Sequence, residues 1–426
     1  MTTHTVDTVV IGAGHAGLAV SRLLTQHGQE HVVLERGGVG ERWRTERWDS
    51  LHLLTPSWMT RLPGWYYTGP DPDGYLSASQ FLRSLQRYAA SFAAPVVGGT
   101  SVRSLRAARD GRFALHTDGD TWHARHVVLA TGPHGTPHVP AGLARSDLHV
   151  VPSNRYRNAE DLPSGGVLVV GASASGTQIA DELARAGRDV VLAVGRHTRM
   201  PRRYRGMDAF WWLERTGRLA RTIDEVADPD VARRETSLQL VGRNQPHPHG
   251  SDLDLAALHR RGVLLCGRLQ GLDGGAATFA ADLPTTVASA DRTMHRFLDV
   301  VDRHVEEAGL TREVLPARRP TRFTPPPAPT RVPLESQGIR TVVLAAGYRP
   351  DHPWVQLPIL DRSGAVEQYR GLTRVPGIYV VGQRFQHRRD SGFIDGARHD
   401  ARTVVAHLSR GVLPESAPRA REESAA

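Results

Sequence analysis

The sequence has very few groups for covalent catalysis by the protein itself. It holds a single cysteine, Cys266, and no lysine, so all 53 basic residues are arginines. One cysteine excludes an internal disulfide and a redox-active cysteine pair, and the lack of lysine excludes Schiff-base chemistry. Because its neighbours in GVLLCGRL are apolar, we expect Cys266 to be a buried strand residue and not a reactive thiol.

The sequence also lacks a long hydrophobic run, since no stretch approaches the ~20 apolar residues of a membrane-spanning helix. Its 426 residues, 40% hydrophobic and 23% charged, predict a globular protein of two or three domains. A strand begins almost at the N-terminus, so we expect no signal peptide and a cytoplasmic bacterial protein. The net charge of +9 raises a nucleic-acid hypothesis. The arginines are spread among acidic residues, however, so we expect neither a nucleic-acid nor a membrane partner.

The N-terminal segment TVVIGAGHAGLAVSRLL has the pattern of a strand, a G-x-G-x-x-G turn and a helix. In such a turn the first glycine permits the tight bend, the second lets a pyrophosphate approach, and the third lets helix and strand pack closely. The next strand, HVVLE, ends in a carboxylate placed to bind ribose hydroxyls. The unit predicts a site for an unphosphorylated adenosine ribose, with contacts from Gly12, Ala13, Gly14, His15, Ala16, Gly17, Glu35 and Arg36.

A second unit, VLVVGASASGTQIADEL, repeats this pattern from residue 167 onward. Serine replaces the middle glycine, and Arg196 stands where the first unit has Glu35. A guanidinium pairs with a 2′-phosphate that a carboxylate would repel, so the second unit favours NADPH. Its predicted contacts are Gly171, Ala172, Ser173, Ala174, Ser175, Gly176, Gln178, Arg196 and Arg202, with help from Arg199 and Arg203 unless this cluster is only a solvated basic loop. An FAD-type turn and an NADPH-type turn in one chain indicate a flavoprotein that NADPH reduces.

Two such units predict an α/β fold with two Rossmann-like dinucleotide-binding domains, each of three layers. The FAD domain is expected to be discontinuous, at 1–160 and 332–413, with an NADPH domain and extra helices inserted at 161–331. The proline-dense 324–333 segment marks the return crossing, and 414–426 is expected to be a disordered tail. Within 284–309, Met294, Leu298, Val301 and Val305 lie at helical spacing, which predicts either a core helix or a substrate lid.

Four further stretches resemble the class B flavin-dependent monooxygenases, the group of the microsomal-type, YUCCA-type and Baeyer–Villiger enzymes. They are RWRTERWDSLHLLTP (42–56), LATGPHGTPHVP (129–140), LAAGYRPDHPW (344–354), and GIYVVGQ followed by DGARHDA. The resemblance covers most of residues 5–410 and is weakest in 200–330. It implies further FAD contacts at Arg42, Trp43, His52, Val102, Ala130, Thr131, Gly132, Gly382 and Gln383.

The linker fingerprint F-x-G-x-x-x-H-x-x-x-[WY] of this group is degenerate here. Counted back from Tyr156, Ser146 replaces its phenylalanine, Leu148 its glycine and Pro152 its histidine. Only Ser153, Tyr156 and the following arginine fit the looser HSxxYR form of relatives. Gln383 likewise stands where many such flavoproteins carry an acid. These departures put the usual linker and the oxygen chemistry in question.

The resemblance implies that NADPH reduces FAD and that O₂ adds to the flavin as a C4a-(hydro)peroxide. This species would oxygenate a nitrogen, a sulfur or a carbonyl carbon of a small substrate. Since the chemistry belongs to the cofactor, no catalytic residue is assigned, and Arg42, His52 and Ser57 are candidates near the flavin ring. Candidates for the substrate pocket are Phe210, Trp211, Trp212, His387, Arg388 and Phe393, with core packing as the alternative for the two tryptophans.

Two other functions stay open at this point. One is an NADPH-dependent flavoprotein reductase or oxidase that transfers no oxygen, and the other is a flavin-binding sensor or partner subunit. The two histidines of NQPHPHGSD (244–252) lie in a Pro/Gly loop, so we expect no metal site there. The sequence leaves open the substrate and whether the chain forms a homodimer.

Overall fold

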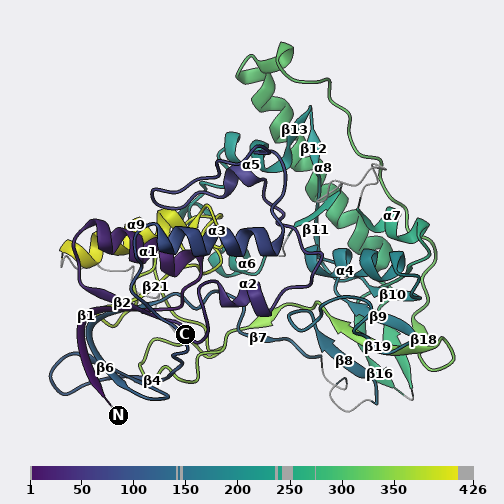
Figure 1. Ribbon diagram of the computed structural model, residues 1–426. Coiled ribbons are helices and arrows are strands. Elements are labelled where there is room, and N and C mark those ends of the chain that lie inside the picture. The colour runs from purple at the N-terminus through teal and green to yellow at the C-terminus, as the bar shows by residue number, and fades with distance from the viewer. Residues whose placement is uncertain are drawn as a thin grey trace, which may run out of the picture.

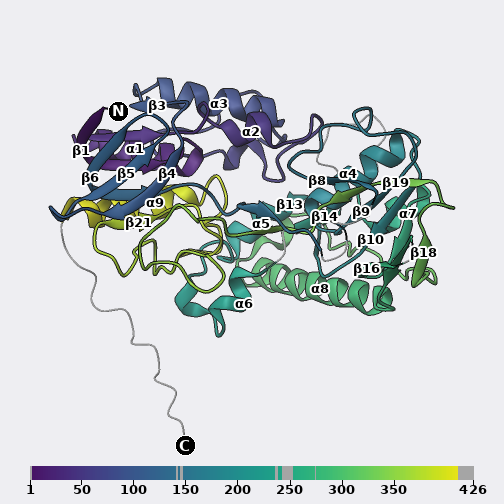
Figure 2. The same cartoon turned by 90° about the horizontal axis from the view of Figure 1, so that it is seen from below.

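The structure, a computed structural model, describes residues 2–140, 143, 147–235, 238–241, 253–273 and 275–410. Two sheets form two lobes that lie side by side, with short strands and the helix labelled α5 between them (Figures 1 and 2). Each lobe contains one of the two glycine-rich turns at the end of its first parallel strand. The α/β fold with two Rossmann-like units is therefore confirmed.

The sheet of the first lobe has the strand order β3-β2-β1-β6-β5-β4, and β21 pairs with the end of β6. β1 pairs in parallel with β2 and β6, whereas β4, β5 and β6 form the expected antiparallel meander. The strands are Thr3–Ile11 (β1), His31–Leu34 (β2), Val96–Val97 (β3), Val102–Ala107 (β4), Phe113–Thr117 (β5), Thr121–Leu129 (β6) and Ile378–Val380 (β21).

Both faces of this sheet are buried, which explains why its parallel strands are apolar at nearly every position. Val10 and Val128 belong to the core formed with the helices on one face, and the adjacent Val9 and Val127 belong to the core on the other. The helices are His15–Gln26 (α1), Ala78–Ala90 (α3) and Ala397–Arg410 (α9). α3 begins as predicted at a serine, because Ser77 forms a capping box with Gln80.

The second lobe contains an all-parallel sheet in the order β15-β10-β9-β19-β8. Its strands are His149–Pro152 (β8), Gly166–Val170 (β9), Val190–Ala193 (β10), Leu264–Cys266 (β15) and Ile339–Leu344 (β19). One face packs on α4 (Ala174–Arg185) and α7 (Leu255–Arg260), and the other on the antiparallel β16 (Leu269–Asp273), β17 (Ala276–Phe279) and β18 (Arg331–Pro333). Cys266 is fully buried in β15, and burial raises the pKa of its thiol to about 12.

Strand pairing corrects the domain limits expected from the sequence. Residues 149–152 and 339–344, which we placed in the first domain, pair in parallel within the second sheet. Their local sequences are buried strands that fit either sheet, and the partner is decided by contacts far apart in the chain. The chain crosses between the lobes at Thr136–Pro137 (β7) and again at Tyr348–Arg349 (β20), and these two crossings pair antiparallel.

An extra cluster of elements lies beside the gap between the lobes. It contains α5 (Ala209–Arg215), α6 (Pro229–Arg233), α8 (Leu283–Glu307), β11 (Thr198–Pro201), β12 (Arg203–Tyr204), β13 (Met207–Asp208), β14 (Leu238–Val241) and the single turns Ser57–Met59, Ile223–Glu225 and Leu310–Arg312. The short helix α2 (Glu41–Thr45) instead packs on α3 of the first lobe. Met294, Leu298, Val301 and Val305 of α8 are buried against Phe210 and Trp212 of α5. The predicted helix is confirmed, and its apolar face packs in this core.

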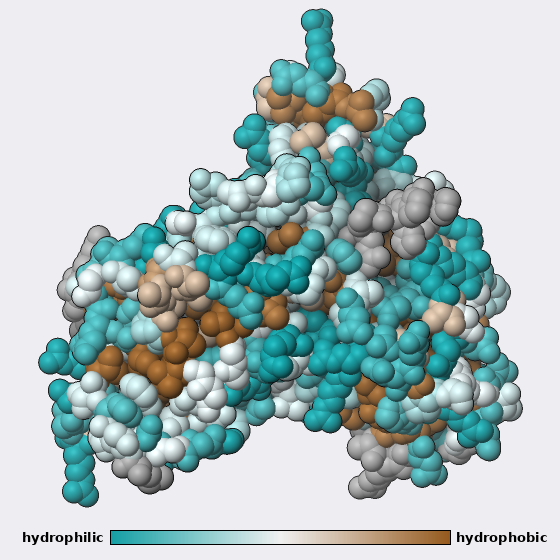
Figure 3. Space-filling view, viewed as in Figure 1, coloured by the Kyte–Doolittle hydropathy of each residue, from teal (hydrophilic) through white to brown (hydrophobic). Residues whose placement is uncertain are grey.

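Hydrophilic side chains cover most of the face shown in Figure 3. Within the described residues, no helix is both long enough and apolar enough to cross a bilayer. The histidine-containing segment 244–252 and the tail 414–426 fall outside the described residues. In the part of the chain that is described, no group of three or more His, Cys, Asp or Glu side chains is arranged to hold a metal ion.

Candidate active site

Packing fixes two of the three glycines in the first turn. Gly12 has a φ of +110°, and a Cβ there would lie 2.7 Å from the carbonyl oxygen of Ala130. A Cβ on Gly17 would lie 1.9 Å from the carbonyl oxygen of Gly12. Neither approach leaves room for a side chain, so these glycines let α1 and the strand ends pack together.

Gly14 differs from its two neighbours, because the protein itself does not require a glycine there. Its φ of −79° is open to any residue, and a Cβ would meet no protein atom within 4 Å. The residue lies at the N-terminus of α1 and lines a cavity. The open side of Gly14 and the free N–H groups of the helix end therefore form a place for a phosphate.

Glu35 lies beside this turn at the end of β2. Its carboxylate is buried and accepts hydrogen bonds from the backbone N–H of Ala13, at 2.7 Å, and of Gly37, at 3.2 Å. The acid is thus held at the cavity wall, one residue from the phosphate place. This is the geometry expected for binding the ribose of a dinucleotide.

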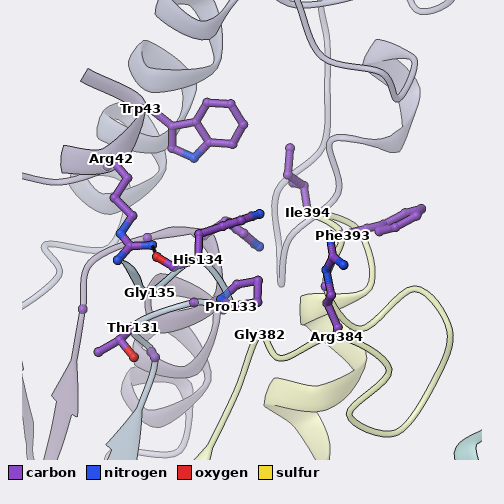
Figure 4. A pocket seen from close by; sticks show the side chains of 18 of the residues that line it. Arg42, Trp43, Thr131, Pro133, His134, Gly135, Gly382, Arg384, Phe393 and Ile394 are labelled. Carbon is purple, nitrogen blue, oxygen red and sulfur yellow. Dashed lines mark hydrogen bonds between the residues drawn. The ribbon is translucent and has the colours of Figure 1, made fainter. Parts of the chain in front are cut away.

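The cavity has a volume of about 740 Å³ and runs from this turn to an apolar end between the lobes. Such a volume suits a small-molecule site. Of the residues predicted to bind the first dinucleotide, those that line it are Gly12, Gly14, His15, Ala16, Glu35, Arg36, Arg42, Trp43, Val102, Ala130, Thr131, Gly132 and Gly382. Figure 4 shows Arg42, Trp43 and His134 on one side and Arg384, Phe393 and Ile394 on the other.

Part of the segment from residue 42 to 57 forms one wall of the cavity: Arg42, Trp43 and Arg47 line it, whereas Ser57 does not. Arg42 donates to the carbonyl oxygen of His134, and Arg47 lies over the ring of Trp43, 4.8 Å from its centroid. Ser57, in contrast, is buried and donates to the carbonyl oxygen of Gly74 at 2.9 Å, which gives it a structural role. His52 is not among the residues that line the cavity, and its Nδ1 lies 3.0 Å from the carbonyl oxygen of Ser50.

Positive charge and neutral imidazoles share the middle of the cavity. Burial lowers the pKa of His15 to about 4 and that of His134 to about 3, and the charge of Arg47 acts in the same direction on both. Burial also lowers the pKa values of Arg42 and Arg384. At neutral pH the two imidazoles are therefore uncharged, while the arginines supply the positive charge for an anionic ligand.

The second turn repeats the first in detail. Gly171 has a φ of +107°, and a Cβ there would lie 2.5 Å from the carbonyl oxygen of Ala345, while one on Gly176 would lie 1.8 Å from that of Gly171. Ser173 takes the place of Gly14, with a φ of −81° that matches it closely. A serine is therefore compatible with the backbone of this turn, and the replacement affects only the space left for a ligand.

The arginines that follow the second turn have different environments. Arg196 is exposed, and one guanidinium N–H donates to the carbonyl oxygen of Arg234 at 3.2 Å. Arg199 is buried between Asp254 and Asp291. Arg202 is buried in an ion pair with Asp208 and donates to the carbonyl oxygen of Leu54 at 2.7 Å. Arg196 thus stays accessible to a phosphate, whereas Arg199 and Arg202 hold carboxylates inside the protein.

The predicted substrate residues divide in a similar way. Phe210 and Phe393 line the apolar end of the cavity, with ring centroids 5.9 Å apart and planes at 74°. Trp212 is fully buried and donates to the carbonyl oxygen of Tyr204 at 2.7 Å, and Trp211 packs edge-on against it. The tryptophans thus serve the core. The other two candidates are His387 and Arg388. The carbonyl oxygen of His387 accepts a hydrogen bond from the backbone N–H of Ile223, and the Arg388 guanidinium forms an ion pair with Asp390.

Several lining residues were not predicted. They include Arg47, Pro133, His134, Asp351, Trp354, Arg384, Phe385 and Arg389. His134, Trp354 and Arg47 lie within stretches that carried the family resemblance, so their motifs were a usable signal. Arg384 and Phe385 follow the Gly382–Gln383 pair directly, but no periodicity marks them.

Comparison with known proteins places this site in a family context. Residues 9–212 match the pyridine nucleotide-disulphide oxidoreductase family. The uncharacterized oxidoreductase CzcO-like of Geobacillus kaustophilus is 29% identical over 94% of this chain and 98% of its own. Indole-3-pyruvate monooxygenase YUCCA1 of Oryza sativa subsp. japonica is 31% identical over 47% of this chain, which spans about half, 51%, of that relative.

Solved structures show the same fold. A flavin-containing monooxygenase from Stenotrophomonas maltophilia has a TM-score of 0.64 at 20% identity, covering 95% of this chain and 99% of its own. Cyclohexanone monooxygenase in a closed crystal structure has a TM-score of 0.55 at 17% identity, covering 96% and 86%. A thioredoxin reductase of T. acidophilum is also similar, with a TM-score of 0.52, so the fold alone does not select the reaction.

Proposed function

We propose that this chain, which shares the fold of flavin monooxygenases, is an NADPH-dependent FAD monooxygenase that oxygenates a small organic substrate with O₂. One observation carries the proposal. A single cavity joins the dinucleotide turn at Gly14 to an apolar end at Phe210 and Phe393. A flavin held at the turn and a substrate held at the apolar end would therefore share one enclosed space.

The residues of the first lobe fit FAD. Gly14 leaves its cavity side open for the pyrophosphate, and Glu35 is held beside it for the ribose hydroxyls. Gly132 has a φ of +77°, and a Cβ there would meet no protein atom within 4 Å, so the chain also leaves the space above it open. The neutral His15 at the start of α1 avoids adding a further buried charge beside the phosphates.

The second turn supports NADPH through Arg196, the accessible arginine after β10. Its guanidinium would pair with the 2′-phosphate after leaving the carbonyl oxygen of Arg234. We no longer assign Arg202 to the cofactor, because its guanidinium is committed to Asp208. In this proposal the second lobe delivers the nicotinamide to the cavity of the first.

The protein's own contribution is placement and exclusion of water. When bound, FAD would accept a hydride from NADPH and supply the activated oxygen. Phe210 and Phe393, with Leu213 and Leu219 behind them, form an apolar wall that keeps water from the reacting atoms. His134, neutral at neutral pH, lies in the wall and accepts the Arg42 N–H at its carbonyl oxygen, which fixes that arginine.

The test is to reduce the purified yellow protein with NADPH without oxygen and then to mix it with O₂ while recording the flavin spectrum. A transient spectrum distinct from both reduced and oxidised flavin supports oxygenation. Direct return to oxidised flavin with one equivalent of peroxide, and no effect of any substrate, would support a reductase or oxidase. The lone buried Cys266 gives this chain no cysteine pair of its own for disulfide reduction.

Arg196→Gln tests the NADPH assignment. Loss of one charge-assisted contact, worth about 1.5–3 kcal/mol, should raise the KM for NADPH about ten- to a hundredfold and leave the KM for NADH unchanged. Arg340→Gln, which changes an exposed arginine of β19, is the matched control and should change neither value. Equal effects of Arg196→Gln on both nucleotides would contradict the assignment.

A further inference from the structure

Arg384 is one of the arginines that line the cavity near its apolar end. It follows the last strand of the first sheet, lines the cavity, and lies beside Phe393 and Ile394 in Figure 4, across from Arg42 and His134. Its hydrogen bond within the protein is one N–H to the carbonyl oxygen of Glu235, at 3.2 Å. Among the described residues no other hydrogen bond engages its guanidinium, so its remaining donors are free for a ligand.

The charge of Arg384 is not neutralised by the protein. Among the described residues no carboxylate forms an ion pair with it, and burial lowers the pKa of the guanidinium without an opposing acid. Its neighbours differ, since Arg388 pairs with Asp390 at 3.0 Å and Arg389 with Glu235 at 2.6 Å. Arg384 is an exposed residue of the cavity wall, so its free donors are open to an anionic ligand, which would form a charge-assisted pair with the guanidinium.

The backbone next to Arg384 is in an unusual conformation. Phe385 is buried, lines the cavity, and has a φ of +43°. A bulky residue in the left-handed region is strained, and such residues persist where the surrounding structure holds them, commonly at ligand sites. The strain gives a second reason, independent of charge, to regard the 384–385 corner as part of a binding site.

An apolar surface lies beside this charge. Phe393 meets Phe210 edge to face, and Met200, Leu213 and Leu219 complete the lining on that side. The dinucleotide phosphates have their own proposed place, at Gly14 in the first glycine-rich turn. A ligand that touches both Arg384 and this surface must carry one anionic group on an apolar body.

We propose that the substrate is a carboxylic acid with an aryl or alkyl body, whose carboxylate binds Arg384 and whose body packs against the surface formed by Phe210 and Phe393. The planar guanidinium matches a carboxylate in a two-bond fork. The assignment rests on the proposed function, because it places the acid beside the flavin. Arg384 is here a specificity residue that selects the charged end of the substrate.

The experiment titrates the oxidised, FAD-loaded protein with 3-phenylpropanoate, hexanoate and indole-3-acetate, each against its own amide, by flavin difference spectra and calorimetry. At least one acid should bind more than tenfold tighter than its amide. Arg384→Gln should weaken that acid about ten- to a hundredfold and leave its amide unchanged, and Arg384→Lys should keep part of the preference. Arg109→Gln, at an exposed arginine of the first lobe, is the matched control.

Three outcomes would overturn the proposal. In the first, no acid binds better than its amide. In the second, Arg384→Gln weakens acid and amide equally. In the third, Arg384→Gln loses FAD or shifts the flavin potential without changing acid binding, which would mean that Arg384 binds FAD and not the substrate. A wild-type protein that binds no FAD or is not reduced by NADPH would instead refute the proposed function, so the two failures are distinguishable.

Discussion

Two glycines of the first turn should respond in opposite ways to the same added methyl group. In Gly17→Ala the new Cβ would lie 1.9 Å from the carbonyl oxygen of Gly12, and backbone cannot rotate away as a side chain can. Overpacking of this kind costs about 1–3 kcal/mol. At about 2–4 °C per kcal/mol for a domain of this size, the apoprotein should melt roughly 2–12 °C lower.

In Gly14→Ala the methyl group meets no protein atom within 4 Å, and the φ of −79° suits alanine. The loss of a favourable N-cap residue and the gain from a less flexible unfolded chain, each about 0.5–1 kcal/mol, roughly cancel. The apoprotein should therefore melt within about 2 °C of wild type. The methyl group occupies the phosphate place, however, so FAD affinity should fall at least tenfold, by about 1.4 kcal/mol or more.

The assay is thermal unfolding of the two apoproteins by circular dichroism, followed by FAD titration at a temperature where both are folded. The reasoning depends on the separation of the two effects. If Gly14→Ala melts as low as Gly17→Ala, the second glycine is structural. If it binds FAD as wild type does, the pyrophosphate does not lie where the turn places it.

Three further predictions concern buried polar groups. Asp400 is fully buried, and burial raises the pKa of its carboxyl to about 7, so the native protein holds a proton that the unfolded chain releases near pH 4. The free energy of unfolding of the protein should therefore fall by up to about 1.4 kcal/mol per pH unit between pH 4 and 7. Asp400→Asn should flatten that part of the pH profile measured by urea denaturation. Tyr156→Phe removes a 2.7 Å hydrogen bond to Glu182 and should lower the free energy of unfolding by about 1.5–3 kcal/mol in the same assay. The control Tyr66→Phe changes an exposed ring and should leave the free energy of unfolding unchanged. Arg202→Gln should lower the free energy of unfolding by about 3–5 kcal/mol, because Asp208 loses its ion-pair partner, and should leave the KM for NADPH unchanged. A rise in that KM without a loss of stability would show that Arg202 binds the cofactor.

The parts of the fold that could be predicted are those with a local signal. Each βαβ unit combines an apolar strand, a glycine-rich turn and a helix of period 3.6 within about thirty residues, and both units formed as expected. The ends of β8 and β19 carry no such signal. β19 pairs with β8 and with β9, and both partners are far from β19 in the chain, so the sequence could not show which lobe β8 and β19 join.

The same limit applies to the side chains of the site. Arg199 and Arg202 look alike in the sequence, as basic residues after a nucleotide-binding strand. Both arginines are held in ion pairs inside the protein, Arg199 with Asp254 and Asp291 and Arg202 with Asp208. Asp254 and Asp291 are far from Arg199 in the chain and reach it only through tertiary packing. Phe210 and Phe393 were predictable as apolar residues near the motifs, but the cation beside them became visible only when the cavity was formed.

The degenerate linker fingerprint illustrates how a lost motif can keep its mechanical role. Tyr156 donates to Glu182 on α4, and Ser50 donates to the same carboxylate, so the linker and the flavin-side segment are tied to the helix that follows the second turn. Arg157 donates in turn to the carbonyl oxygens of Thr45 and Arg47. None of these bonds needs the histidine that Pro152 replaces.

This arrangement has a consequence for catalysis. Because Arg157 holds the backbone of Arg47, the cavity wall on that side is fixed to the linker and, through Glu182, to the second lobe. A shift of the second lobe when NADPH enters would therefore be felt first at Arg47 and Trp43, against which Arg47 packs. The hydrogen bonds of Tyr156, Ser50 and Arg157 thus link the second lobe to this wall of the cavity without the residues that the linker fingerprint has lost.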